Sequence, residues 1–158
     1  MTYAQANEEQ QVKQIHEWFT TTNQEESTYQ TKEVELNNLS TEGGSAKGFF
    51  SNHRLVKIEA KLYGETGNWI GEYYYHQAIL YFVFTQTNHY NGHILAPKVK
   101  ISRVEENRYY FWEGKMIRWL DQHKKKVDPH SQIFKNKATE IRTLSHSMQA
   151  KFVKYKSE

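Results

Sequence analysis

The chain has 158 residues, a formal net charge of +3, 37% hydrophobic and 15% aromatic residues, and no cysteine. This length fits one domain, 1–158, with a core of its own, and the missing cysteine excludes disulfides, thiolate metal sites and a cysteine nucleophile. No segment approaches the roughly 18–20 consecutive apolar residues that a membrane-spanning helix needs.

The charges are divided unevenly along the chain. Residues 1–45 contain two Lys and eight Glu, whereas residues 114–158 contain eleven Lys or Arg and four Asp or Glu. The two ends can attract each other if they fold close together, or the basic end can bind an anionic partner such as nucleic acid. Mutual attraction is favoured over a nucleic-acid partner, because the basic residues are spread along a predicted helix instead of forming one run.

The first predicted element is a helix over residues 7–22, in which Val12, Ile15 and Phe19 recur at helical spacing. Just before it, Ala4-Gln5-Ala6 has the A-x-A form that signal peptidase cleaves. We therefore expect an exported location, which is periplasmic, secreted or anchored on the exported side of a membrane. A cytoplasmic location is the alternative.

An antiparallel β-meander of six to eight strands is predicted over residues 29–120. Apolar or alternating runs follow one another there, and most are separated by two to four turn residues, too few for a parallel connection. The expected strands are 29–36, 46–50, 54–63, 69–75, 79–87, 98–104, 107–111 and 116–120. Residues 79–85 are apolar on both faces, so this strand should lie inside the sheet, with Phe82 facing the last helix.

Three segments of the predicted sheet repeat one pattern of two aromatic residues, a polar turn and an apolar strand. They begin at Phe49, Tyr74 and Tyr110, and they predict three related hairpins side by side. Further motifs in this stretch are Leu55-Val56-Lys57-Ile58, Leu62-Tyr63-Gly64-Glu65, Glu72-Tyr73-Tyr74-Tyr75, Tyr81-Phe82-Val83-Phe84, Glu106-Asn107-Arg108-Tyr109-Tyr110-Phe111 and Met116-Ile117-Arg118-Trp119-Leu120.

On these motifs, residues 48–120 resemble exported, lipoprotein-type β-meander proteins of bacteria, Bacteroidetes-like in character. The hairpins also resemble a loose variant of MORN repeats, from which they depart in the turns: Asn52-His53, Gln77-Ala78 and Glu113-Gly114 stand where Asn-Gly is expected. The resemblance covers about half of the chain. It implies an exported β-meander and supplies no catalytic residue.

The last predicted element is a long helix over residues 129–156, which starts at Asp128-Pro129. One apolar stripe should pack across a face of the sheet, with the first helix as its neighbour. The stripe consists of Phe134, Ala138, Ile141, Ser145, Met148 and Phe152. The predicted fold is therefore α+β, a meander with a helix at each end of the chain.

Six aromatic residues are candidates for ligand binding: Trp69, Tyr73, Tyr75, Tyr81, Tyr109 and Trp112. Much of this set is expected on the sheet face opposite Val56, Ile58, Ala60 and Leu62. Rings on a second face indicate either a second covering layer or a surface that binds the rings of glycans or peptides. Both interpretations stay open.

The candidate metal ligands are His89 and His93, four residues apart in a loop-like segment. Two ordinary loop histidines explain the same pattern with fewer assumptions, because a third ligand would have to come from Glu105, Glu106 or His76.

Among the acidic residues, Glu72 shares a strand face with apolar neighbours. We expect it to form a structural ion pair with Arg108 or Arg118, which is favoured over a role as a catalytic acid.

No glycine-rich phosphate loop and no nucleophile elbow is present in the sequence, so no catalytic residue and no cofactor is predicted. The chain is expected to be a non-enzymatic, exported binding or scaffold domain whose aromatic sheet face takes an unknown protein, peptide or glycan ligand. One alternative is a small metal-dependent hydrolase built on His89 and His93. The other is a nucleic-acid or anion binder that uses the basic last helix.

Overall fold

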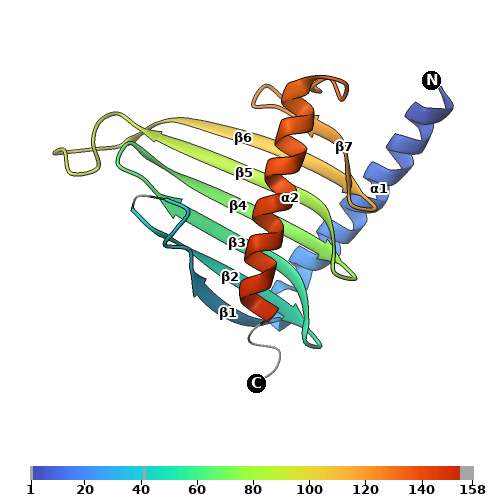
Figure 1. Cartoon of the computed structure of the whole chain (residues 1–158), viewed down its shortest axis with the longest axis horizontal. Helices are drawn as coiled ribbons and strands as arrows, with labels where there is room; N and C mark the ends of the chain where they lie inside the picture. The colour runs from blue at the N-terminus through green and yellow to red at the C-terminus, as the bar shows by residue number, and fades with distance from the viewer. Residues whose placement is uncertain (1, 41, 154–158) are drawn as a thin grey trace.

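Within residues 2–40 and 42–153, which the computed structural model describes, seven antiparallel strands form a single sheet (Figure 1). They lie in chain order, so each strand pairs only with its neighbours in the sequence. The strands are β1 (Gln30–Glu35), β2 (Gly44–Ser51), β3 (Arg54–Tyr63), β4 (Gly67–His76), β5 (Ile79–Tyr90), β6 (Ile101–Trp112) and β7 (Lys115–Leu120). The predicted α+β meander is confirmed. The expected strands 98–104 and 107–111 are one strand, β6, because Glu105 and Glu106 continue the pairing with β5.

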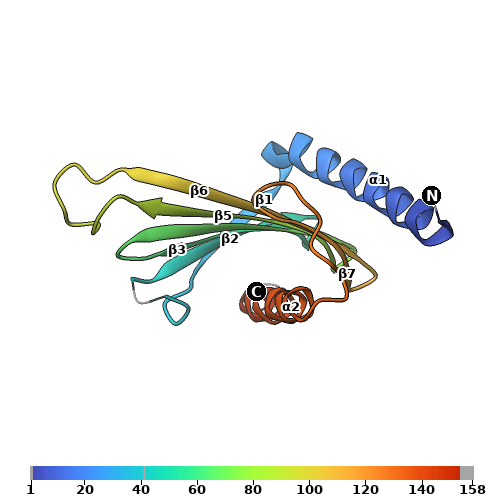
Figure 2. The same ribbon diagram turned by 90° about the horizontal axis from the view of Figure 1, so that it is seen from above.

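Two helices cover opposite faces of this sheet, α1 (Tyr3–Gln24) on one and α2 (Gln132–Val153) on the other. Figure 2 shows the sheet edge-on between them, so the expectation that the helices are neighbours is wrong. A 3₁₀ turn, η1 (Glu26–Thr28), connects α1 to β1. In the described part of the chain, neither helix has a stretch long and apolar enough to cross a membrane.

The helix boundaries differ from the predicted ones because of local capping. Helix α1 begins four residues early, since the Thr2 hydroxyl accepts a hydrogen bond from the Gln5 amide (3.1 Å) and the Gln5 side chain accepts one from the Thr2 amide (2.8 Å). Ala4-Gln5-Ala6 therefore lies in the first turn of α1. Helix α2 begins at Gln132 because Ser131 Oγ accepts the Phe134 amide (3.3 Å). Residues 154–156 of the predicted helix lie outside the described residues.

Each of the three sequence repeats contains a β-bulge at the same position. The pairing register shifts at Phe49/Phe50, at Tyr74/Tyr75 and at Tyr110/Phe111, the aromatic pairs that open the repeats. In each case one residue of the following strand has no partner: Val56, Tyr81 and Ile117, seven residues after the first aromatic residue of its repeat. A bulge bends and twists the strand that carries it. The repeat is thus a hairpin that bends close to its turn.

The sheet divides the interior into two apolar cores. The larger lies under α2, where all six residues of the predicted stripe are buried. The smaller lies under α1 and consists of Val12, Ile15, Tyr74, Tyr81, Phe82 and Tyr110. Phe82 faces α1, 5.3 Å from the Phe19 ring centroid, and not α2 as expected. The bulge at Tyr81 is the reason, because it leaves Leu80 on the α2 side and turns Phe82 to the other.

Charged groups hold α1 to the sheet at both ends of the helix. Near its start, Arg118 contacts Glu8 (Nε to Oε1, 3.2 Å) and Glu9, and Lys126 lies 3.6 Å from Glu8. These contacts confirm the expected attraction between the acidic first part and the basic last part of the chain. They also occupy Arg118, and Arg108 pairs with Glu106, so neither is the partner of Glu72.

The actual partner of Glu72 is Lys57, whose side chain is only 4% exposed. Its ammonium lies 3.2 Å from Glu26, 3.1 Å from Glu59 and 3.4 Å from Glu72. It also donates to Asn23 Oδ1 at the end of α1 (3.1 Å). The structural ion pair expected for Glu72 therefore exists, but with a lysine of β3 and not with Arg108 or Arg118.

Candidate functional site

A groove of about 630 Å³ lies between α2 and the sheet, and we call it the aromatic groove. Its floor consists of side chains from five strands, β3 to β7, and its wall is the first half of α2. The rings that line it are Trp69, Tyr73, Tyr109 and Trp119. A volume of this size is in the range that small-molecule and short-chain ligands occupy.

Trp69 and Tyr73 form one aromatic pair of this floor, two residues to either side of Gly71. Their ring centroids are 6.5 Å apart. A Cβ atom on Gly71 would lie 2.4 Å from Cη2 of Trp69 and 2.9 Å from Cε2 of Tyr73, so both rings lie over the glycine. Glycine at this position therefore allows the two rings to lie low on the sheet. Tyr73 is 1% exposed, whereas Trp69 is only partly buried and presents ring surface to the groove.

The second aromatic pair is Tyr109 and Trp119, on β6 and β7, with ring centroids 5.4 Å apart. Trp119 Nε1 donates a hydrogen bond to Asn107 Oδ1 (2.9 Å), which fixes the indole in its plane. Burial raises the pKa of Tyr109 to about 12, a hydrogen bond with Thr85 acts in the opposite direction, and the Glu140 carboxylate adds to the increase. Polar partners thus hold both rings from the side of the sheet.

Charged side chains lie at the edges of the aromatic groove. On α2, Lys137 and Glu140 form an ion pair of 3.1 Å. On β6, Glu105 contacts Arg103 (3.2 Å) and His89 (3.6 Å).

Burial also raises the pKa of Tyr73 well above its ordinary value. Both groove tyrosines are therefore neutral at physiological pH and act as hydrogen-bonding groups, not as bases or nucleophiles. This arrangement suits binding better than catalysis.

The six aromatic candidates do not form one site. Trp69, Tyr73 and Tyr109 line the aromatic groove, whereas Tyr75 and Tyr81 line a second cavity at the other end of the strands. Trp112 belongs to the α1 side, where it stacks on Trp18 with centroids 5.6 Å apart.

The expected face for the aromatic set was also wrong. Trp69, Tyr73 and Tyr109 share the α2 side with Ile58 and Ala60, because the strands that carry them pair in that register. Sequence reasoning did not assign Trp119, Asn107 and Thr85 to the groove. Two of them, Thr85 and Asn107, are polar residues within apolar or aromatic strand segments, a signal that could have been used.

The two candidate metal ligands contact different glutamates. His89 contacts Glu105 (3.6 Å), whereas His93 contacts Glu65 (3.6 Å) in the β3–β4 turn. In residues 2–40 and 42–153, no group of three or more His, Asp or Glu side chains is placed to hold a metal ion. On the basic last segment, Lys126 and Lys137 already have glutamate partners.

Comparisons with known proteins add no relative. No family model, curated protein or solved structure matches the chain. The suspected likeness to exported β-meander proteins therefore stays a prediction.

Proposed function

We propose that this chain is a non-enzymatic binding domain that holds a ring-bearing ligand in the aromatic groove. The observation that carries the proposal is the partly buried indole of Trp69, which lines the groove and lies beside Tyr73 over Gly71. An indole that is supported from below and open from above offers a flat apolar surface to another ring. Neutral tyrosines and the absence of an activated nucleophile in the groove favour binding over chemistry.

A saccharide is the ligand class that fits the groove best. The C–H face of a sugar ring can stack on the Trp69 indole, while its hydroxyls need hydrogen-bond partners around the edge. Thr87 and Glu105 on the sheet and Glu140 on α2 supply such partners on both sides of the ring surface. A purely apolar ring would leave these groups unused. A peptide with an aromatic side chain is the second ligand class to be tested.

The proposal keeps the exported location that the sequence predicts, since extracellular and periplasmic domains meet free glycans. Fractionation of the native host with an antibody against the domain tests this part. Recovery in the cytoplasmic fraction alone would contradict it, without affecting the groove itself.

Tryptophan fluorescence tests binding directly, because two of the four tryptophans lie in the groove and two lie on the α1 side. A Trp18→Phe/Trp112→Phe background leaves only Trp69 and Trp119 as reporters. An oligosaccharide array selects the probe, and its titration should change the emission. Trp69→Ala should weaken binding at least tenfold, which corresponds to about 1.4 kcal/mol.

Two variants make the test specific to the groove. Gly71→Ala keeps every ring but forces Trp69 and Tyr73 to move, so it should also weaken binding. Trp112→Ala on the opposite face, made in place of Trp112→Phe in the same background, is the matched control and should not change the affinity. Binding of aromatic peptides but of no saccharide would refute the ligand class, while the groove would remain the binding site. Equal affinity in Trp69→Ala and the parent protein would refute the site.

A further inference from the structure

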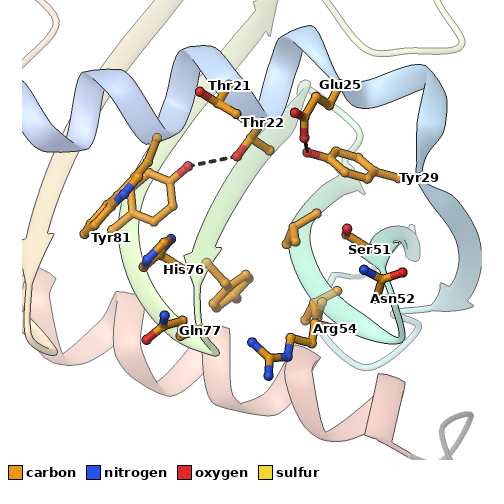
Figure 3. Close-up of a pocket in the computed structure, with 14 residues that line it drawn as sticks. Thr21, Thr22, Glu25, Tyr29, Ser51, Asn52, Arg54, His76, Gln77 and Tyr81 are labelled. Atoms are coloured by element: carbon orange, nitrogen blue, oxygen red, sulfur yellow. Dashed lines mark hydrogen bonds between the residues drawn. The ribbon is translucent and has the colours of Figure 1, made fainter.

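A second cavity, of about 600 Å³, lies on the α1 side at the end of the sheet where the hairpins turn (Figure 3). We call it the turn cavity. The last turns of α1, the β2–β3 turn and the β4–β5 turn surround it. It is separate from the aromatic groove and plays no part in the proposed glycan binding.

One wall of the turn cavity is a fixed aromatic stack. The Trp18 indole lies parallel to the His76 ring, with centroids 4.1 Å apart and planes 11° apart, and it meets the edge of Tyr81 at 5.3 Å. The Tyr81 hydroxyl lies 3.3 Å from Thr22 Oγ1, a hydrogen bond that Figure 3 shows. Leu55 and Val56 add apolar surface. This part of the cavity accepts an apolar or aromatic side chain.

Two opposite charges face the cavity from different sides. Figure 3 shows Glu25 beside the end of α1 and Arg54 across the cavity from it. Neither forms an ion pair with another described residue, whereas Arg103, Arg108 and Arg118 each contact a glutamate. Among the described residues, the Glu25 carboxylate accepts a hydrogen bond from the Tyr29 hydroxyl alone, at 3.4 Å. Both residues are exposed, so the cavity offers a solvated carboxylate and a solvated guanidinium, neither with a counter-ion among the described residues.

The position of Glu25 makes its side of the cavity favour a cation. It is the C-cap residue of α1, and the last turn of that helix contains no basic residue. The C-terminal end of a helix carries partial negative charge, and a carboxylate there adds to it. An ammonium group of a ligand would complement both, as a lysine in the last turn does in other helices.

The two turns at the cavity keep side chains where glycine is favoured. Asn52 and His53 have φ values of 50° and 66°, and Gln77 and Ala78 have 51° and 68°. Left-handed backbone of this kind strains residues with a Cβ atom, and hairpin turns normally relieve it with Asn-Gly or Gly-Gly. The third turn, away from the cavity, has Gly114 at its second position. Asn52 and Gln77, the first residues of the two turns, line the cavity, whereas His53 and Ala78, which stand where the third turn has Gly114, do not.

We propose that the turn cavity binds a dipeptide with free termini and an apolar or aromatic side chain. Its carboxylate pairs with Arg54 and its ammonium with Glu25, while Asn52 and Gln77 hydrogen-bond the groups between the two charges. The side chain of the ligand rests on the Trp18–His76 stack. No covalent step is involved.

Isothermal titration with glycyl-tyrosine, its N-acetyl derivative and its C-terminal amide tests the charge pairing. The free dipeptide should bind, and each capped form should bind at least tenfold more weakly. Glu25→Gln should lower the affinity for the free dipeptide and for its amide. It should not lower the affinity for the N-acetyl form further, because that form has no ammonium left. Arg54→Gln should show the reverse pattern. Arg142→Gln, an exposed arginine on α2, is the matched control and should leave the affinity unchanged.

The turn variants give a second, independent measurement. Ala78→Gly and Gln77→Gly both relieve the strain of a left-handed backbone and should raise the melting temperature. Only Gln77→Gly should lower the affinity for the dipeptide. Trp69→Ala should not change the affinity for the dipeptide. Failure of the glycan proposal and failure of the dipeptide proposal are therefore distinguishable. If glycyl-tyrosine at millimolar concentration gives no heat of binding, the proposal is overturned. Equal binding of the doubly capped dipeptide would also overturn it.

Discussion

Replacement of Lys57 by methionine isolates the ion cluster that joins α1 to the sheet. Methionine keeps the apolar stem and removes only the charge. Three carboxylates then remain within one small region, and two of them, Glu59 and Glu72, are direct cross-strand partners. Like charges in that position repel each other.

The magnitude follows from burial. Loss of one member of a buried ion pair costs roughly 3–5 kcal/mol. Here Lys57 is 4% exposed, but its three carboxylates are 27–43% exposed and can recover part of their hydration. We therefore expect a loss of about 3 kcal/mol in the free energy of unfolding, at the lower end of that range. For a domain with roughly 5–15 kcal/mol in total, this loss is large.

Urea unfolding followed by circular dichroism measures the effect. Lys61→Met is the matched control, since Lys61 lies on the same strand and face and no glutamate lies within ion-pair distance of it among the described residues. It should change stability by less than about 0.5 kcal/mol. Adding Glu72→Gln to Lys57→Met should restore part of the loss, because one of the crowded carboxylates is then neutral. If Lys57→Met and Lys61→Met cost the same, the cluster does not stabilise the fold as described.

Two further predictions test the core and the pH response. Phe82→Ala removes a ring that packs against Phe19 and Tyr110 and should cost roughly 3–5 kcal/mol in urea melts, whereas Lys135→Ala on the exposed side of α2 should cost less than about 0.5 kcal/mol. A mild loss in Phe82→Ala would mean that the α1 core contributes little. Burial acts to lower the pKa of Lys57, but the carboxylates of Glu72 and Glu59 outweigh it and raise the pKa above 10.5. The stability difference between the parent and Lys57→Met should therefore stay constant from pH 7 to about pH 10 and shrink as the pH rises further through the raised pKa. A difference that shrinks between pH 7 and 9 would contradict the raised pKa.

The sheet could be predicted from the sequence because the patterns that indicate it are local. Short runs with few turn residues between them allow only hairpins, and the stripe of α2 from Phe134 to Phe152 shows a clear helical period. What the sequence did not reveal was which helix covers which face. A single unpaired residue such as Tyr81 inverts the in–out alternation of the strand beyond it. The repeat marks the position of this residue, but nothing in the repeat indicates a bulge there.

The candidate sites were harder to predict for the same reason. Three of the six chosen aromatics, Trp69, Tyr73 and Tyr109, meet in one groove, but only because strands β4 and β6 are held on either side of β5. The fourth ring, Trp119, and the charges of the turn cavity come from segments far apart in the sequence. Glu25 and Arg54 lie on different elements, and nothing in their local sequence indicates that they face one space.

The bulge shared by the three hairpins makes each of them a self-contained unit. Every strand pairs only with its neighbours in the chain, and each unit includes its own turn and its own bend. One hairpin can therefore be added or removed without changing the register inside the others. The number of strands in the sheet therefore depends on the number of repeats. Each added hairpin would widen the surface under α2 by two strands.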